Sequence, residues 1–283
     1  MMDRYKLIEK VGEGGFGSVY KALDKETNTI VAIKEIKTKK FGSTKDPVEE
    51  INALLEIKNP DTQTNYIVNY KNAFVFTGEK GNVYYIVTEF LEGGTLGDWI
   101  VNHPNRTFRE VWPIMMQLAL GLKQIHKAGY AHRDIKLSNI MINKYNNIKY
   151  IDFGISCIEE CKLEECDNYC SNPGIRGTPG YIAPEILKNK TSGDLYDSQK
   201  ADIWSLSIVF YKLIYGIEYA PFQFQKGPPM RYDTTYINRV STIGPDRRND
   251  FFIKEICVQE PTKRPSLRAL VDYMNLVLFS HPF

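Results

Sequence analysis

The chain has 283 residues, of which 43% are hydrophobic and 25% are charged, and its net charge is +2. This length and composition suit one large domain or two small lobes, whereas the near-neutral charge argues against nucleic acid or a membrane surface as a partner. Because no signal segment and no apolar run of about 18 to 20 residues is present, we expect a cytoplasmic protein.

The segment from Leu7 to Ile36 has the pattern of three β-strands. Between the first two strands stands the glycine-rich stretch Gly12-Glu13-Gly14-Gly15-Phe16-Gly17-Ser18-Val19. Glycines suit a turn whose backbone N–H groups approach phosphate oxygens. A dinucleotide-binding loop has similar spacing but opens a helix, whereas residues 19–23 continue as a strand pattern. The sequence therefore predicts a β-hairpin that covers the phosphates of a nucleotide.

Lys34 stands on a predicted strand directly after the aliphatic residues Val31-Ala32-Ile33. A lysine in such surroundings needs a partner charge, because burial disfavours the ammonium form. Residues 47–58 repeat apolar side chains at helical spacing, and this predicted helix offers Glu49 and Glu50 as partners. The alternative is an ordinary solvated surface lysine.

The rest of the first half changes from strands to helices. Strand patterns at 68–77 and 83–88 are followed by the turn-like segment 89–95. Residues 112–127 then predict a long apolar helix, which Gly129 ends. The sequence thus predicts an α+β protein with its strands first and most of its helices second.

Three short motifs between residues 132 and 185 carry candidate chemistry. They are His132-Arg133-Asp134-Ile135-Lys136-Leu137-Ser138-Asn139, then Asp152-Phe153-Gly154, and then Gly177-Thr178-Pro179-Gly180-Tyr181-Ile182-Ala183-Pro184-Glu185. Phosphoryl transfer requires a carboxylate near the attacking hydroxyl and oxygen ligands for Mg²⁺. Asp134 suits the first role, and Asn139 and Asp152 suit the second. Each residue alone could equally cap a loop, but the ordered set favours a phosphoryl-transfer site.

Together, these motifs resemble the protein kinase family over about Tyr5 to Leu276. The resemblance implies one bilobal domain of the α+β class spanning residues 1–283. A small β-rich N-lobe with helix C would cover about residues 1–88, a hinge about 89–95, and a larger, mostly helical C-lobe about 96–283.

The resemblance also implies ATP as a cofactor. Lys34 would contact its phosphates and be held by Glu50, with Glu49 the less favoured partner. The nucleotide would be contacted by Val11, Gly12, Glu13, Gly14, Gly15, Phe16, Gly17, Val19, Ala32, Lys34, Thr88, Glu89 and Leu91. The hinge backbone would bind the adenine, and the small side chain of Thr88 would leave a pocket behind it.

For catalysis, the resemblance assigns the base to Asp134 and Mg²⁺ binding to Asn139 and Asp152. Lys136 would contact the transferring phosphate, and Thr178 would bind both Lys136 and the base. Lys136 and Thr178 resemble the residues found at these places in the serine/threonine-specific members of the family. The implied partner is a protein with a serine or threonine acceptor, and we expect a monomer.

Two other functions stay in competition with a serine/threonine protein kinase. One is a pseudokinase, a binding or scaffold module without catalysis, and the retention of Lys34, Asp134 and Asp152 argues against it. The other is a kinase fold acting on a small molecule, and Lys136 with the 177–185 segment argues against that.

Further along the chain, the resemblance implies two structural contacts. Asp202 would accept hydrogen bonds from the backbone of the loop that contains Asp134. Arg264 would form a buried pair with Glu185, because a bidentate arginine–carboxylate pair can fix the end of a segment. Residues 221–249 resemble the family poorly.

Four of the five cysteines lie between residues 157 and 170, in the spacing C-x3-C-x4-C-x3-C. They are Cys157, Cys161, Cys166 and Cys170. They could be reduced thiols, four thiolate ligands of a structural Zn²⁺, or regulatory disulfides, the last disfavoured in a reducing compartment. Family members often carry an activating phosphate near Pro173 and Gly174, where this chain has no hydroxyl, and Ser171 is the nearest. We hypothesise that zinc orders this segment in place of phosphorylation.

Overall fold

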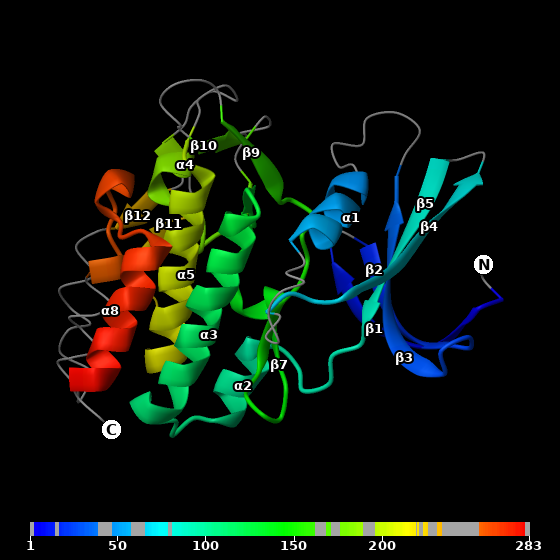
Figure 1. Cartoon of the computed structure of the whole chain (residues 1–283), viewed down its shortest axis with the longest axis horizontal. Helices are drawn as coiled ribbons and strands as arrows, with labels where there is room; N and C mark the ends of the chain where they lie inside the picture. The colour runs from blue at the N-terminus through cyan, green and yellow to red at the C-terminus, as the bar shows by residue number, and fades with distance from the viewer. Residues whose placement is uncertain are drawn as a thin grey trace.

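The computed structural model describes residues 3–14, 17–38, 47–57, 66–78, 81–161, 168–170, 176–188, 196–218, 220, 223–225, 231–233 and 255–280. A small lobe dominated by strands lies beside a larger lobe dominated by helices, as Figure 1 shows. This arrangement confirms the predicted α+β, bilobal fold class. The residue numbers given for the lobe boundaries stay predictions.

The small lobe is built on a five-stranded antiparallel sheet with the order β1-β2-β3-β5-β4. The strands are β1 (Tyr5–Gly14), β2 (Gly17–Asp24), β3 (Thr29–Lys37), β4 (Tyr70–Gly78) and β5 (Gly81–Glu89). The β-branched residues of β3 suit its position inside the sheet, where side chains pack on both faces. Helix α1 (Pro47–Glu56) is the one helix described in this lobe.

The sheet of the small lobe has its own hydrophobic core. Tyr5, Val31, Ile33, Phe74 and Val87 are buried there. The ring centroids of Tyr5 and Phe74 are 5.7 Å apart in a stacked arrangement. Burial of such side chains stabilises the lobe by roughly 1.5 to 3 kcal/mol each, and two of them, Val31 and Ile33, come from β3, the strand that carries Lys34.

The large lobe packs around two long helices, α3 (Phe108–Lys127) and α5 (Ser198–Tyr215). Helix α5 is buried on nearly all sides, which fits its apolar composition. Among the described residues, this lobe also has the helices α2 (Leu96–Asn102), α4 (Pro184–Lys188) and α8 (Leu267–Ser280), with short 3₁₀ turns at η1 (Leu137–Asn139) and η3 (Pro261–Lys263).

Helix α3 begins at Phe108, four residues before the predicted start at Trp112. The Glu110 carboxylate accepts hydrogen bonds from the backbone N–H and the hydroxyl of Thr107, at 2.7 and 2.8 Å. This is the Thr-x-x-Glu pattern of a capping box, a signal that the apolar periodicity alone does not contain. Gly129 follows the helix at φ +79°, where other residues are strained.

Short strands hold the loops between these helices. Strand β6 (Tyr130–Ala131) joins β9 (Cys157–Cys161) and β10 (Asn168–Cys170) in a three-stranded sheet, and β7 (Ile140–Ile142) pairs with β8 (Ile148–Tyr150). A further pair is formed by β11 (Gln223–Gln225) and β12 (Arg231–Asp233). The loop before β7 and the segment after β8 are thereby brought together between the lobes.

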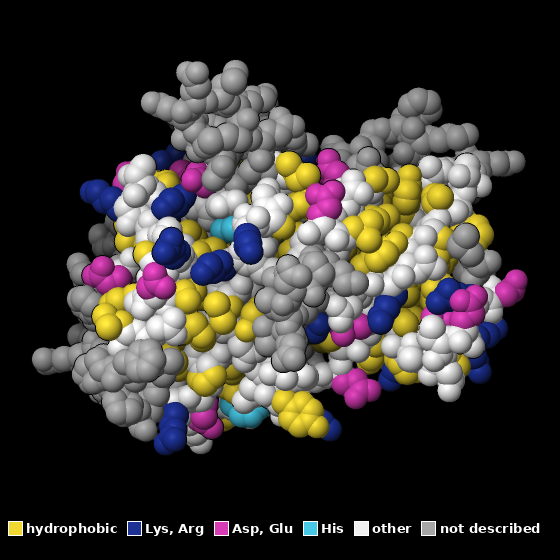
Figure 2. All heavy atoms as spheres, in the orientation of Figure 1, with side chains coloured by type: hydrophobic (Ala, Val, Ile, Leu, Met, Phe, Trp, Pro, Cys, Tyr) yellow, Lys and Arg dark blue, Asp and Glu magenta, His cyan; other side chains and the backbone are white. Residues whose placement is uncertain are grey.

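The distribution of charge on the surface fits the nearly equal numbers of basic and acidic residues in the sequence. Basic and acidic side chains are interspersed over the described part of the face in Figure 2. Within the described ranges, the helices include none with the length and apolar run needed to cross a membrane.

Candidate active site

Lys34 is held by two carboxylates from distant parts of the chain. Its Nζ donates hydrogen bonds to both carboxylate oxygens of Glu50, at 2.6 and 2.7 Å, and to Oδ1 of Asp152 at 2.7 Å. Glu50 is buried on α1, whereas Glu49 is exposed. The structure therefore brings Lys34 to Glu50, the carboxylate favoured from the sequence.

The electrostatics of this cluster favour the charged forms of Lys34 and Asp152. Burial of the Lys34 ammonium lowers its pKa, but the charges of Glu50 and Asp152 outweigh burial and raise the pKa above its ordinary value. Burial raises the pKa of Asp152, but the charge of Lys34 outweighs it and holds that pKa below its usual range. Lys34 is thus a fixed cation, aimed from β3 into the space between the lobes.

Asp134 lies at the centre of a second cluster. Its carboxylate accepts hydrogen bonds from the Thr178 hydroxyl at 2.6 Å, from Lys136 Nζ at 2.8 Å and from Asn139 Nδ2 at 3.0 Å. Lys136 Nζ also donates to the Thr178 hydroxyl oxygen at 2.7 Å. The structure therefore brings together four of the predicted catalytic residues, around a buried carboxylate.

Helix α5 fixes the loop that carries Asp134. The buried Asp202 carboxylate accepts hydrogen bonds from the backbone N–H groups of His132 and Arg133, at 2.7 and 2.8 Å. Arg133 and Asp152 both have a positive φ, near 65°, a conformation that costs a non-glycine residue about 1 to 3 kcal/mol. The Asp202 contacts, expected from the sequence, offset that strain in the loop.

The two clusters are joined through the packing of the loop. The His132 ring is fully buried, and its centroid lies 4.8 Å from that of Phe153, which follows Asp152. The backbone N–H of Ile151 donates to the carbonyl of Asn139 at 3.0 Å. These contacts hold Asn139 and Asp152 on neighbouring segments.

Asn139 and Asp152 have the donor atoms that suit Mg²⁺. The Asn139 amide nitrogen faces Asp134, which leaves its amide oxygen as the atom that can ligate a cation. Lys34 contacts Oδ1 of Asp152, so Oδ2 is the other candidate ligand. One amide oxygen and one carboxylate oxygen match the preference of a hard cation.

Many of the residues predicted to contact a nucleotide lie on strands β1, β2 and β3 and at the end of β5. Val19 lies opposite Gly12 on one side and Lys34 on the other, and Ala32 lies opposite Thr88. Gly17 has φ +128°, and a Cβ there would lie 1.9 Å from a backbone oxygen of Glu35, so only glycine fits.

Some members of this predicted set have side chains paired with other residues, or lie outside the described residues. The Glu13 side chain forms a surface ion pair with Lys10, at 2.8 Å. Gly15 and Phe16 lie outside the described residues. The Glu89 carboxylate pairs with Lys149 at 2.7 Å and accepts from the backbone N–H of Asn69 at 2.8 Å, whereas the contact expected of Glu89 belongs to its backbone and stays a prediction.

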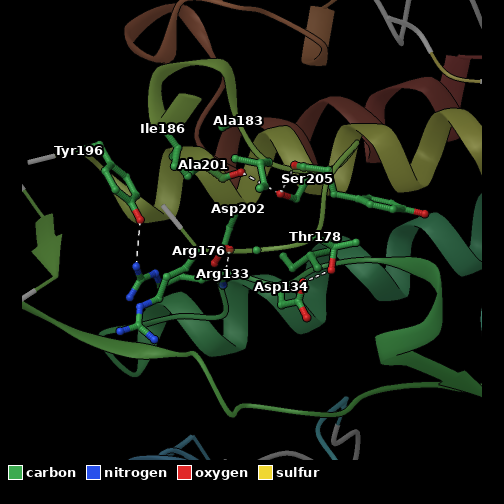
Figure 3. A pocket seen from close by; sticks show the side chains of 14 residues that line it. Arg133, Asp134, Arg176, Thr178, Ala183, Ile186, Tyr196, Ala201, Asp202 and Ser205 are labelled. Carbon is green, nitrogen blue, oxygen red and sulfur yellow. Dashed lines mark hydrogen bonds between the residues drawn. The ribbon is translucent and has the colours of Figure 1, made fainter. Parts of the chain in front are cut away.

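Figure 3 shows a cavity beneath the 176–183 segment. Asp134 and Thr178 line it, as do Arg133, Arg176 and Tyr196, which sequence reasoning did not single out for this place. Arg133 donates a hydrogen bond to the Tyr196 hydroxyl at 3.0 Å. Tyr196 stands in a stretch without a recognisable motif, so only the fold reveals its place here.

The end of the same segment is fixed by a buried ion pair. Arg264 donates two hydrogen bonds to the Glu185 carboxylate, both at 2.7 Å. The guanidinium also donates to the carbonyl oxygens of Lys200, Val258 and Gln259. This geometry is the bidentate pair expected from the sequence.

The zinc hypothesis has no support. Cys157 is disulfide-bonded, and a disulfide sulfur is not a thiolate ligand. Across the described residues, no three histidine, cysteine, aspartate or glutamate side chains gather as a metal site. The side chains of Cys161 and Cys170, together with Cys166 and Ser171, lie outside the described part, so phosphorylation of Ser171 stays a prediction.

The sequence of this chain is similar to those of known proteins. A family model described as "Protein kinase domain" matches residues 5–274. "CBL-interacting protein kinase 33" of Oryza sativa subsp. japonica is 34% identical over 225 residues, and "Serine/threonine-protein kinase pakH" of Dictyostelium discoideum is 35% identical over 214 residues. "Serine/threonine-protein kinase 10" of Danio rerio is 32% identical over 279 residues.

These alignments cover 78%, 75% and 96% of this chain, in that order. They cover 45%, 37% and 26% of the respective relatives. The chain therefore spans less than half the length of each of these proteins.

Proposed function

Because the chain belongs to the protein kinase domain family, we propose that it transfers the γ-phosphate of ATP to serine and threonine hydroxyls of proteins. The observation that carries this proposal is the simultaneous assembly of both charged clusters. Lys34 is held by Glu50 and Asp152, while Asp134 is held by Lys136 and Thr178. Such transfer depends mainly on positioning and on stabilisation of negative charge.

On the nucleotide side, Lys34 would hold the phosphates with its fixed positive charge. Asn139 and Asp152 would hold Mg²⁺, whose charge would offset that of the phosphates during transfer. The glycines at the β1–β2 turn would present backbone N–H groups to the phosphates. Val11, Val19, Ala32 and Leu91 would enclose the base, and Thr88 would lie behind it.

On the acceptor side, Asp134 would accept the proton of the attacking hydroxyl. Lys136 Nζ would then contact the phosphoryl group as it approaches. Since Thr178 donates to Asp134, the 176–183 segment is tied to the base itself. A substrate chain lying on this segment would present its hydroxyl to the carboxylate, which favours a protein acceptor over a small molecule.

Acceptor specificity can be tested directly. The full chain would be incubated with γ-labelled ATP, Mg²⁺ and degenerate peptide pools in which serine, threonine or tyrosine is the sole acceptor. We expect label in the serine and threonine pools and background in the tyrosine pool. Label confined to the tyrosine pool, or to a small-molecule acceptor, would contradict the proposal. Nucleotide binding without transfer to any acceptor would instead support the pseudokinase alternative.

We also propose that the chain acts as a monomer in the cytoplasm. Light scattering of the purified chain and fractionation of expressing cells would test these two points. A stable dimer or a secreted product would contradict them.

A further inference from the structure

Helix α1, which carries Glu50, packs against the large lobe as well as the small one. Its buried residue Leu54 and the following residue Ile57 lie in the same hydrophobic cluster as Tyr130 of β6. The core of the small-lobe sheet is a separate cluster. In Figure 1, α1 lies between the sheet and strand β9, and it contacts both β4 and β9. The position of Glu50 is therefore set in part by the large lobe.

Two hydrogen bonds attach the C-terminal end of α1 to the large lobe. The Tyr130 hydroxyl donates to Oε2 of Glu56, the last residue of α1, at 2.8 Å. The side-chain amide of Gln124, on α3, donates to the carbonyl oxygen of Ile57 at 3.1 Å. The end of α1 that lies farther from Glu50 is thus fixed to two elements of the other lobe.

Tyr130 connects this helix to the loop that contains Asp134. Only 3% of its surface is exposed, so its hydroxyl needs a partner in the protein. Burial raises the pKa of Tyr130, and the hydrogen bond to Glu56 raises it further, so the hydroxyl keeps the proton that it donates. Strand β6, which begins at Tyr130, leads directly into the loop, and Asp134 follows four residues after Tyr130. One side-chain contact therefore joins the helix of Glu50 to the loop of the proposed base.

The geometry of α1 lets a contact at Glu56 influence Glu50. The two residues are six positions apart on one helix, which corresponds to about 9 Å along its axis. Because the helix moves as a unit, a shift of its C-terminal end also displaces the Glu50 carboxylate, which binds Lys34 Nζ at 2.6 and 2.7 Å. A misplacement of about 1 Å at a catalytic group can lower a rate by about 10²-fold. A restraint on this end of α1 should therefore be measurable in the rate.

We propose that Tyr130 is a positioning residue that acts through Glu56 and α1 to hold Glu50 against Lys34. This inference rests on the proposed kinase function. Tyr130 and Glu56 are not among the residues expected to contact the nucleotide or the acceptor, so their role is indirect. It fixes the distance between the cation on β3 and the carboxylate in the 132–139 loop.

The anchoring of α1 is tested without nucleotide or acceptor. Hydrogen exchange of the full chain would be followed by mass spectrometry for wild type, Tyr130→Phe and Glu56→Ala. We expect the amides of α1 to exchange about 5- to 10-fold faster in both variants, and those of α5 to exchange as in wild type. Glu49→Ala removes an exposed carboxylate from the same helix and should match wild type. Unchanged exchange of α1 in Tyr130→Phe and Glu56→Ala would overturn the proposal.

The effect on catalysis is tested by steady-state phosphorylation of a peptide. Tyr130→Phe and Glu56→Ala should each lower kcat/KM by about 5- to 10-fold. The double variant should lose no more than either single variant, because both substitutions remove the same hydrogen bond. Glu56→Gln keeps an oxygen that can accept from the Tyr130 hydroxyl and should stay within about 3-fold of wild type. Losses that add in the double variant would overturn the proposal.

A second background separates positioning from a general structural effect. In Glu50→Gln chains the contact with Lys34 is already weakened, so Tyr130→Phe should lower kcat/KM by less than about 2-fold further. An equal factor in both backgrounds would show that Tyr130 does not act through Glu50 and would overturn the proposal. If the wild-type chain transfers no phosphate, the proposed kinase function fails, and the hydrogen exchange of α1 still decides whether Tyr130 anchors the helix.

Discussion

The loop at 132–139 and the segment at 152–185 form the two halves of one site, but they are held in different ways. The loop rests on buried backbone contacts with Asp202. The segment is fixed at separate points, each by a side chain far away in sequence: Asp152 by Lys34, Thr178 by Asp134 and Glu185 by Arg264. The loop is therefore anchored to the core of the large lobe, whereas Asp152, Thr178 and Glu185 are each fixed by one side chain distant in sequence.

The largest effect should follow from removal of the charge that fixes the start of the segment. Lys34→Met should lower kcat on the order of 10³-fold, because it removes a fixed cation from the phosphates and from Asp152. Steady-state phosphorylation of a peptide would measure it. Lys37→Met is the matched control, since Lys37 lies on the same strand with an exposed side chain. An equal loss in both variants would show that general damage to β3 is responsible.

The largest effect on folding stability should come from the other end of the segment, where Arg264 binds Glu185. Arg264→Ala should lower the free energy of unfolding by about 3 to 5 kcal/mol, because it leaves the Glu185 carboxylate partly buried without its partner. Urea titration followed by circular dichroism would measure the loss. Arg268→Ala removes an exposed arginine with only a 4.0 Å contact to Asp272 and should change stability by less than about 0.5 kcal/mol. Similar losses in the two variants would contradict the role of the buried pair.

Substitutions of Thr178, in the middle of the segment, test whether its hydrogen bond or its side-chain shape supports activity. Thr178→Val should lower kcat/KM by about 10- to 100-fold, because a hydrogen bond to a charged carboxylate is lost. Thr178→Ser keeps the hydroxyl and should stay within about 3-fold of wild type. If both variants lose activity equally, the methyl group rather than the hydroxyl would be the feature that matters.

A smaller effect should appear at the buried thiol of the large lobe. Burial raises the pKa of Cys257 from 9.0 to about 12, so the folded state retains its proton more strongly than the unfolded chain. The resulting stabilisation is fully present below pH 9 and is lost as pH rises towards 12. Unfolding titrations across this range should show a larger loss in wild type than in Cys257→Ala, because tyrosines with raised pKa values, such as Tyr181, contribute a loss in both proteins. A parallel decline in the variant would assign the effect to another group.

No effect is expected from zinc removal. Protein purified without chelator should contain well under one zinc per chain, and treatment with a chelator followed by fresh Mg²⁺ should leave kcat unchanged. Elemental analysis of the purified chain would measure this. Stoichiometric zinc would revive the four-thiolate hypothesis.

The sequence predicted the loop better than the segment, and the reason is physical. Asp134, Lys136 and Asn139 lie within six residues, so their spacing alone limits how they can be arranged. Glu50 could be separated from Glu49 only through family resemblance, because one helical step decides which carboxylate is buried. The contact of Arg133 with Tyr196 depends on packing between distant segments, which local periodicity does not encode.

The central claim is that Asp134 accepts the proton of an acceptor hydroxyl beside a nucleotide held by Lys34. Single-turnover transfer from γ-labelled ATP, measured for wild type and Asp134→Asn at saturating Mg²⁺, tests it most directly. We predict a loss of about 10²- to 10⁴-fold in the transfer rate with ATP affinity changed less than about 3-fold. Equal transfer rates in the two proteins would contradict the account.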